Sequence, residues 1–134
     1  MPEPGVSMDP QLAQQVKAYA FGRIGIGAVA IVAPKSALRR WLGPASTGAD
    51  IRLLARSAGV RDVAIGIGTV LALNHDAPVR GWLEAAALSD AGDLVAALLG
   101  LRSGLPRRQL VGTALAAAAG AAYGRQLVSR LPSS

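Results

Sequence analysis

Charged side chains that lie within long apolar stretches are the residues of this sequence most able to do chemistry. They are arginines and aspartates, at Arg23, Arg56, Arg61, Asp62, Asp90 and Asp93. An ionised group at the centre of a bilayer costs at least about 2.5–3.5 kcal/mol, so such residues pair with one another or line a wet cavity. We therefore expect these side chains to form one buried polar cluster.

The spacing of the charged residues indicates which of them can meet. Asp90 and Asp93 are three positions apart and share one face of a helix. Arg61 and Asp62 are adjacent and point about 100° apart on a helix, so one can face Asp90 or Asp93 while the other faces Arg23. We expect Arg61 and Asp90 to be partners, with Asp93 and Asp62 as the next candidates.

Two uses of such a cluster are open. The aspartates outnumber Arg23 and Arg61 by one, so one carboxylate is either protonated or paired with Arg56. The cluster then titrates protons or binds a solute, or it is an ion-pair network that fixes the register of the helices. Two close carboxylates are also typical of hydrolases, but no nucleophile or metal motif accompanies them, so we expect no enzyme and no catalytic residue.

Neither a metal nor a cofactor is expected. The chain has no cysteine, which removes thiolate ligands and thiol catalysis. His75 is the only histidine and lies in a turn with Asn74 and Asp76, where a metal would need further ligands from elsewhere. The glycines of residues 22–27 do not have the spacing of a dinucleotide or phosphate-binding loop.

Small residues form a second pattern, a stripe with a spacing of four at Gly112, Ala116, Gly120 and Gly124. Such a stripe lets another backbone approach closely, which in lipid replaces the hydrophobic driving force for helix association. We expect the stripe to pack against a helix of the same bundle or of a second copy.

Four apolar helical segments have to position these residues. They cover roughly residues 11–33, 51–73, 80–101 and 107–128, and the breaks between them contain proline, glycine or turn-forming polar residues. About 20 residues at 1.5 Å each span the ~30 Å of a bilayer's hydrocarbon. We expect residues 1–10 to be a flexible leader, residues 11–128 a single four-helix domain and residues 129–134 a C-terminal tail.

Composition favours a membrane location for this bundle. Hydrophobic residues make up 51% and charged residues 16% of the 134 residues, whereas soluble domains have about 25% charged residues. Residues 110–122 are almost wholly Ala, Gly, Leu and Val, and four helices cannot bury one of their number on every side. The fold predicted is an all-α four-helix bundle that spans a membrane. A soluble helical bundle is the alternative, because the uncharged runs are shorter than about 18 residues.

The net charge of +6 does not form a nucleic-acid face, because the cations lie mostly in short connections and aromatic residues are few. With four spans, one side of the membrane carries the larger group of cations, and the other side carries the smaller group, Lys17, Arg80, Arg125 and Arg130. The larger group is Lys35, Arg39, Arg40, Arg52, Arg102, Arg107 and Arg108. This bias predicts a multi-pass protein of the inner membrane with both termini outside, in contact with lipid and with a second copy or another membrane protein.

The charged residues are also the basis of a resemblance. The element Arg-x-x-Gly-x-Arg-Asp at residues 56–62 and the element Asp-x-x-Asp at residues 90–93 resemble small bacterial membrane proteins grouped as domain of unknown function 4267. The resemblance covers about residues 18–101. It implies a four-helix membrane protein and implies no activity.

We therefore expect a small integral membrane protein that acts as a binding or structural component, with a buried Arg/Asp network at mid-membrane. The alternative is a transporter of protons or a small solute that uses the buried carboxylates. Access of water to Asp90 and Asp93 separates the two, because transport requires it and a packed ion network does not.

Overall fold

The computed structural model describes residues 8–42, 48–102 and 107–132, and these are almost entirely helical, with no strand among them. The helices are α1 (Pro10–Val32), α2 (Pro34–Leu42), α3 (Ala49–Asn74), α4 (Arg80–Gly100) and α5 (Arg107–Ser129). The predicted all-α class is confirmed. The predicted connections at residues 43–47 and 103–106, residues 1–7 of the predicted leader and residues 133–134 of the predicted tail lie outside the described residues.

The described residues form five helices where four were expected, because α2 occupies part of the first connection. Pro34 ends α1 as expected but is also the first residue of α2, a position where proline's missing N–H costs nothing. Ala33 separates the two helices with a non-helical φ of −125°, and its carbonyl accepts the first α2 hydrogen bond from Ala37 N–H at 3.0 Å. The residues that follow have no glycine or proline to stop the helix before Leu42.

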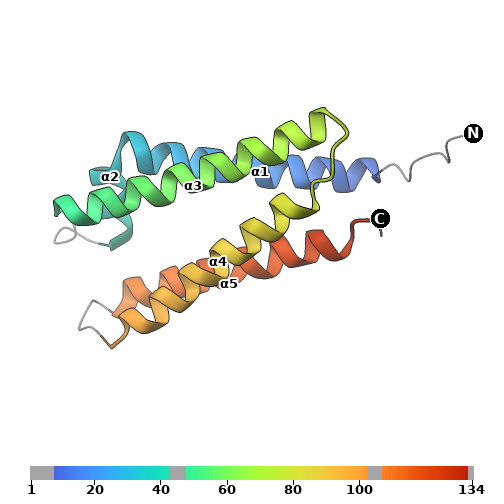
Figure 1. The fold of residues 1–134 in the computed structure, drawn as a ribbon. Helices are drawn as coiled ribbons and strands as arrows, with labels where there is room; N and C mark the ends of the chain where they lie inside the picture. The colour runs from blue at the N-terminus through green and yellow to red at the C-terminus, as the bar shows by residue number, and fades with distance from the viewer. Residues whose placement is uncertain (1–7, 43–47, 103–106, 133–134) are drawn as a thin grey trace, which may run out of the picture.

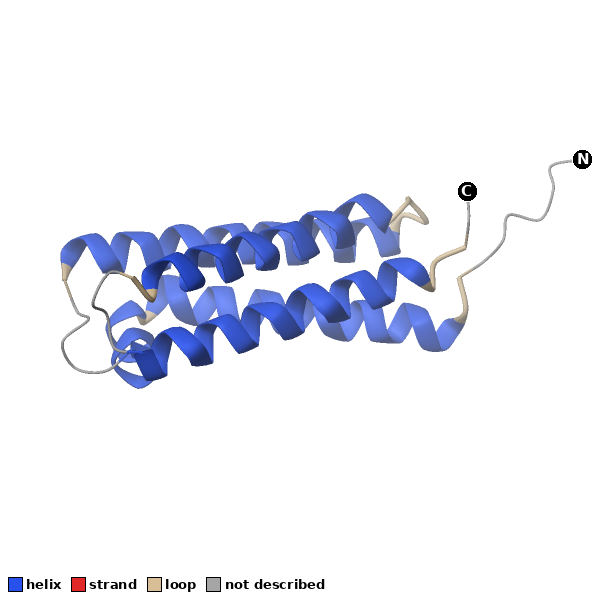
Figure 2. Cartoon of the chain, turned by 90° about the horizontal axis from the view of Figure 1, so that it is seen from below, coloured by secondary structure: helices blue, strands red, loops and turns tan. Residues whose placement is uncertain are grey.

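The long helices run alternately up and down and lie alongside one another (Figures 1 and 2). The most extensive backbone contacts join α1 to α3 and α4 to α5, whereas α3 and α4 meet over a smaller area. We call α1, α2 and α3 the N-terminal hairpin, and α4 and α5 the C-terminal hairpin. The start of α1 and the end of α5 lie at one end of the bundle, and α2 lies at the other (Figure 1).

Glycines bring α1 and α3 close together. A Cβ on Gly27 would lie 2.5 Å from the carbonyl oxygen of Gly59, and a Cβ on Gly59 would lie 2.6 Å from the carbonyl oxygen of Gly27. Further along, a Cβ on Gly66 would lie 2.7 Å from the carbonyl oxygen of Ala20. The backbones are therefore in direct contact, an arrangement that larger side chains would prevent.

The predicted stripe on α5 contacts the rest of the bundle at Gly120 and Gly124 and leaves it at Gly112 and Ala116. A Cβ on Gly124 would lie 3.3 Å from Ala87 Cβ, but nothing lies within 4 Å of Gly112, and Gly112 and Ala116 are exposed. A step of four residues overshoots one helical turn by about 40°, so three steps rotate the stripe by about 120°. The buried face instead has steps of three, seven and three residues, through Ala114, Ala117, Gly124 and Leu127.

The large apolar side chains lie largely on the outside. A small apolar core fills the end of the bundle away from α2, formed by Leu12, Val16, Ala72, Val79, Leu83 and Leu127. By contrast, large apolar residues along every long helix are exposed, among them Ile26, Val32, Leu54, Leu88 and Leu115. The exposed fractions reach 75% for Leu88 and 81% for Val32. The apolar core is therefore confined to one end of the bundle, while many large apolar side chains are exposed along the long helices.

Candidate functional site

Arg23 is the centre of the polar cluster. Its side chain projects from α1, and the residue is only 8% exposed. Nη1 and Nη2 donate to the two carboxylate oxygens of Asp90 on α4, at 2.8 and 2.9 Å, and Nη2 also donates to Asp62 Oδ1 on α3 at 2.8 Å. A planar guanidinium thus binds one carboxylate with two parallel hydrogen bonds and a second carboxylate at its side, the strongest pairing available to arginine.

Tyr19 completes the surroundings of Arg23. Its hydroxyl accepts a hydrogen bond from Arg23 Nη1 at 2.8 Å and lies 3.4 Å from Asp90 Oδ2, to which it donates. The Tyr19 ring packs edge to face against Tyr123 of α5, with ring centroids 5.7 Å apart. Neither tyrosine was predicted as part of the cluster, although the spacing of four between Tyr19 and Arg23 places them on one helix face.

A second ion pair lies beside the first and is more open to solvent. Arg61 on α3 donates from Nη1 and Nη2 to the two oxygens of Asp93 on α4, at 3.0 and 2.7 Å. Arg61 Nη2 also lies 3.6 Å from Asp62 Oδ1, which links the two pairs. The Arg61 and Asp93 side chains are 35% and 43% exposed, whereas those of Arg23 and Asp90 are 9% and 13% exposed.

The sequence therefore predicted most members of the cluster but not every partner. As expected, one residue of the adjacent pair, Asp62, faces Arg23, while Arg61 faces α4. The first choice of Asp90 as the partner of Arg61 is corrected to Asp93, because Arg23 occupies both oxygens of Asp90.

Arg56 lies outside the cluster, which corrects its inclusion there. It is exposed, and its Nε donates to the carbonyl oxygen of Ile31 at 3.2 Å. Arg56 precedes Arg61 by five residues, so it lies more than one turn away and about 140° round the helix. Its contact is with one of the last carbonyls of α1, which have no partner within the helix.

The cluster lies at the interface of the two hairpins. Arg23, Arg61 and Asp62 belong to the N-terminal hairpin, and Asp90 and Asp93 belong to the C-terminal one, so the ion pairs Arg23–Asp90 and Arg61–Asp93 cross the interface. The small apolar core also joins the two hairpins at one end. Further cross-contacts are Trp41 Nε1 to Thr113 Oγ1 at 2.9 Å, Arg130 Nη1 to Gln15 Oε1 at 2.6 Å, and the Trp82 ring against Gly68.

Some donors of the cluster have no partner among the described residues. These are Arg23 Nε and Arg61 Nε, both buried, and the neighbouring hydroxyl of Ser89 is buried without a partner as well. Each such atom has lost its hydration without gaining a hydrogen bond in the described part of the chain. The cluster thus has free hydrogen-bonding capacity beyond its ion pairs.

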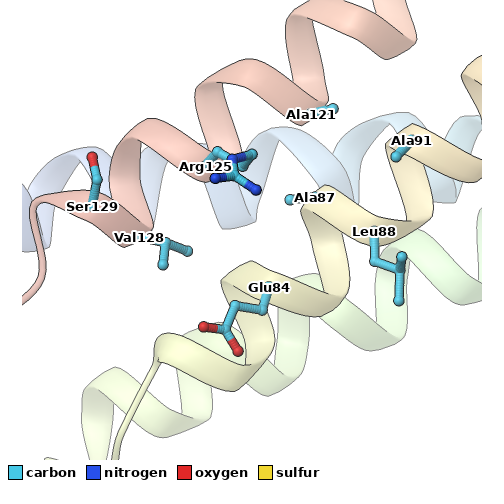
Figure 3. Close-up of a pocket in the computed structure, with 8 residues that line it drawn as sticks. All are labelled: Glu84, Ala87, Leu88, Ala91, Ala121, Arg125, Val128 and Ser129. Carbon is cyan, nitrogen blue, oxygen red and sulfur yellow. The ribbon is translucent and has the colours of Figure 1, made fainter.

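A groove between α4 and α5 is separate from the cluster (Figure 3). It has a volume of about 570 Å³, and Glu84 of α4 and Arg125 of α5 project at its sides (Figure 3). Its described lining contains none of the cluster residues and is mainly small or apolar, consisting of Ala87, Leu88, Ala91, Ala121, Val128 and Ser129 beside the charged pair. A substrate in this groove would not touch the cluster.

The described residues contain no group of three or more His, Asp or Glu side chains placed to hold a metal ion. His75 is exposed in the turn after α3, and its Nδ1 lies 2.8 Å from the carbonyl oxygen of Leu71. Of the described helices, α1 alone is both long enough and apolar enough, by composition, to cross a membrane.

Comparisons with protein-family models, with curated proteins and with solved structures found no match to this chain. The resemblance to domain of unknown function 4267 stays a prediction.

Proposed function

We propose that this chain is a small multi-pass membrane protein that acts as a structural or binding component. The distribution of side chains is the observation that carries the proposal. Charged residues lie at the centre of the bundle, and large apolar residues lie on its exterior. A soluble bundle favours the reverse arrangement, with its apolar face turned to the core.

The exposed apolar residues extend along all four long helices rather than forming one patch. Examples from the separate helices are Ile26, Leu54, Leu88 and Leu115, each at least 66% exposed. Soluble monomers rarely expose contiguous apolar patches larger than about 600 Å². Lipid tails would solvate such a surface at no cost.

The lengths of the helices suit a bilayer. The four long helices have between 21 and 26 residues, which corresponds to about 32–39 Å and exceeds the ~30 Å of hydrocarbon. The charges of α3 and α4 lower the hydropathy of those helices, but Arg61, Asp62, Asp90 and Asp93 each form an ion pair with a residue of another helix. The buried pair of Arg23 and Asp90 would be shielded from lipid, whereas Arg61 and Asp93 are partly exposed.

Extraction from membranes tests this proposal. We expect the expressed chain to sediment with membranes, to resist an alkaline carbonate wash, and to stay monodisperse only in detergent. A chain that is soluble and monodisperse without detergent would contradict the proposal and favour the soluble helical bundle. Labelling of single cysteines introduced near the ends of α1 and α5 from either side would test the proposed inner-membrane location with both termini outside.

Transport of protons or a small solute is the second candidate. The observation that favours it is the exposure of Asp93, whose side chain is 43% exposed although it belongs to the same network as the buried Asp90. The carboxylate of Asp93 is thus accessible from the surface, whereas the carboxylate of Asp90 is buried. In proteoliposomes, a transporter would acidify the lumen and lose that flux in Asp93→Asn, while the control Glu84→Gln would keep it. Flux no greater than that of empty liposomes would exclude this candidate.

A further inference from the structure

The exposed cations of the bundle are concentrated at the end where α2 lies. This basic end consists of Lys35, Arg39 and Arg40 on α2 together with Arg102 just after α4 and Arg107 and Arg108 at the start of α5, all of them exposed. Trp41 of α2 joins these two groups through its hydrogen bond to Thr113 of α5. At this end the exposed acidic residue among those described is Asp50 in the first turn of α3, whereas at the other end of the bundle Asp9, Asp76 and Glu84 accompany the cations. The two ends therefore differ in charge even when the acidic residues are included.

Arg107 and Arg108 lie at positions where arginine does not stabilise a helix. They form the first turn of α5, which contains no acidic residue. The N-terminal end of a helix carries partial positive charge, so arginine there is unfavourable, and the neighbouring cations of α2 add repulsion. An anionic partner would offset both effects.

The surface next to the basic end indicates the class of that partner. Val32 at the end of α1, Leu54 in the first turns of α3 and Leu99 in the last turn of α4 are exposed by 81%, 69% and 62%. Cations at the border of an apolar surface match the boundary between phospholipid headgroups and acyl chains. Single-stranded nucleic acid would instead require aromatic side chains spaced for base stacking, and Trp41 alone supplies one among the described residues of α2.

The orientation of α2 agrees with that boundary. Leu38 is buried against the bundle, whereas Lys35, Arg39 and Arg40 are exposed, and the Trp41 ring is 57% exposed while its N–H is bonded. A short helix with one apolar face, basic residues and a tryptophan is typical of segments that lie in the interface plane of a membrane. Guanidinium groups there can bind phosphate oxygens with paired hydrogen bonds.

We propose that the basic end binds the headgroups of anionic phospholipids, with α2 lying among them. This inference rests on the membrane location proposed above and adds the lipid class and the contacting residues. It identifies the basic end as the one that faces the leaflet richer in anionic lipid.

Lipid retention tests the inference. The purified chain is reconstituted into vesicles of equal phosphatidylcholine and phosphatidylglycerol, re-extracted in mild detergent, and the lipids that stay bound are quantified. We expect phosphatidylglycerol to be enriched about threefold or more at low salt, and the enrichment to decrease as salt is added. Lys35→Gln/Arg39→Gln/Arg40→Gln should lose most of it. The matched control Arg80→Gln/Arg125→Gln/Arg130→Gln removes the same charge from the other end and should keep it.

The outcomes separate the two proposals. Carbonate-resistant insertion with equal retention of both lipids, or equal loss of enrichment in both triple variants, would overturn the lipid inference and leave the membrane proposal standing. Salt-reversible binding to phosphatidylglycerol vesicles without insertion would keep the inference and overturn the membrane proposal. Displacement of the bound lipid by a short DNA duplex at equal phosphate concentration would overturn the inference in favour of nucleic acid.

Discussion

The N-terminal hairpin and the interface between the hairpins have different leading contacts, although the hairpin also contains the ion pair of Arg23 with Asp62. Within the N-terminal hairpin, Gly27 and Gly59 bring two backbones into direct contact. Between the hairpins, Arg23 binds Asp90 through two hydrogen bonds between buried side chains. A close backbone contact of this kind depends only on the size of the side chains on the neighbouring helix. An ion pair instead specifies which helix packs there, in which direction it runs and in which register. The glycine contact should therefore respond to side-chain size, and the ion pair to the loss of one partner.

Loss of a buried partner should have the largest effect. Asp90→Ala leaves Arg23 with Asp62 alone in a buried site, and removing one member of a buried pair costs about 3–5 kcal/mol of stability. Thermal unfolding in detergent measures this loss. The control Glu84→Ala removes an exposed carboxylate, 3.9 Å from Arg80, and should cost no more than about 1 kcal/mol.

The double change Arg23→Ala/Asp90→Ala sharpens the comparison. It removes both buried charges and should therefore be less destabilising than Asp90→Ala alone. If the two single losses simply add in the double variant, the pair does not hold the hairpins together and the ionic interface has been misjudged.

The contact within the hairpin should respond to size rather than to charge. Gly27→Ala places a Cβ 2.5 Å from the carbonyl oxygen of Gly59, so the helices must separate, at a cost of about 1–3 kcal/mol. Gly25→Ala is the matched control on the same helix, because nothing lies within 4 Å of its Cβ position. There the higher helix propensity of alanine should leave the melting temperature equal or raised. Equal melting of the two variants would contradict close packing of α1 on α3.

The more exposed pair should contribute less than the buried one. Arg61 and Asp93 are partly solvated, so Arg61→Ala should cost roughly 1 kcal/mol, within the range of exposed ion pairs. A double-mutant cycle with Asp93→Ala should show coupling, and one with Asp90→Ala should show less, because Asp90 is bound by Arg23. Stronger coupling of Arg61 to Asp90 than to Asp93 would restore the pairing predicted from the sequence.

Helical periodicity predicted which faces carry charge but not how far one helix slides along another. Asp90 and Asp93 share a helix face, so their spacing allows either one to be the partner of Arg61. The position of α4 along the axis of α3 determines that the partner is Asp93. The predicted burial of Arg56 is wrong for a different reason. Its position within an apolar segment predicts a buried side chain, but its angular position on α3 places the side chain on the outside of the bundle. The sequence predicts a connection at residues 34–42 because Pro34 ends a helix, although proline is also a favoured first residue of the next helix.

Within the stripe on α5, Gly112 gives the smallest expected effect, and its comparison with Gly120 separates packing inside the bundle from association between copies. Gly120→Leu should destabilise the protein, because a Cβ there already lies 2.6 Å from Asp90 Oδ2, at the ionic interface. Gly112→Leu should change the free energy of unfolding by less than about 0.5 kcal/mol, and so leave the melting temperature nearly unchanged, because its surroundings are open.

Sizing in detergent supplies the second measurement. A shift of Gly112→Leu to a smaller species with unchanged melting would show that the outward half of the stripe joins two copies, and unchanged size would show that it faces lipid. Strong destabilisation by Gly112→Leu would mean that α5 is rotated from its place here, and the distinction between a glycine contact within a hairpin and an ionic contact between hairpins would no longer hold for α5.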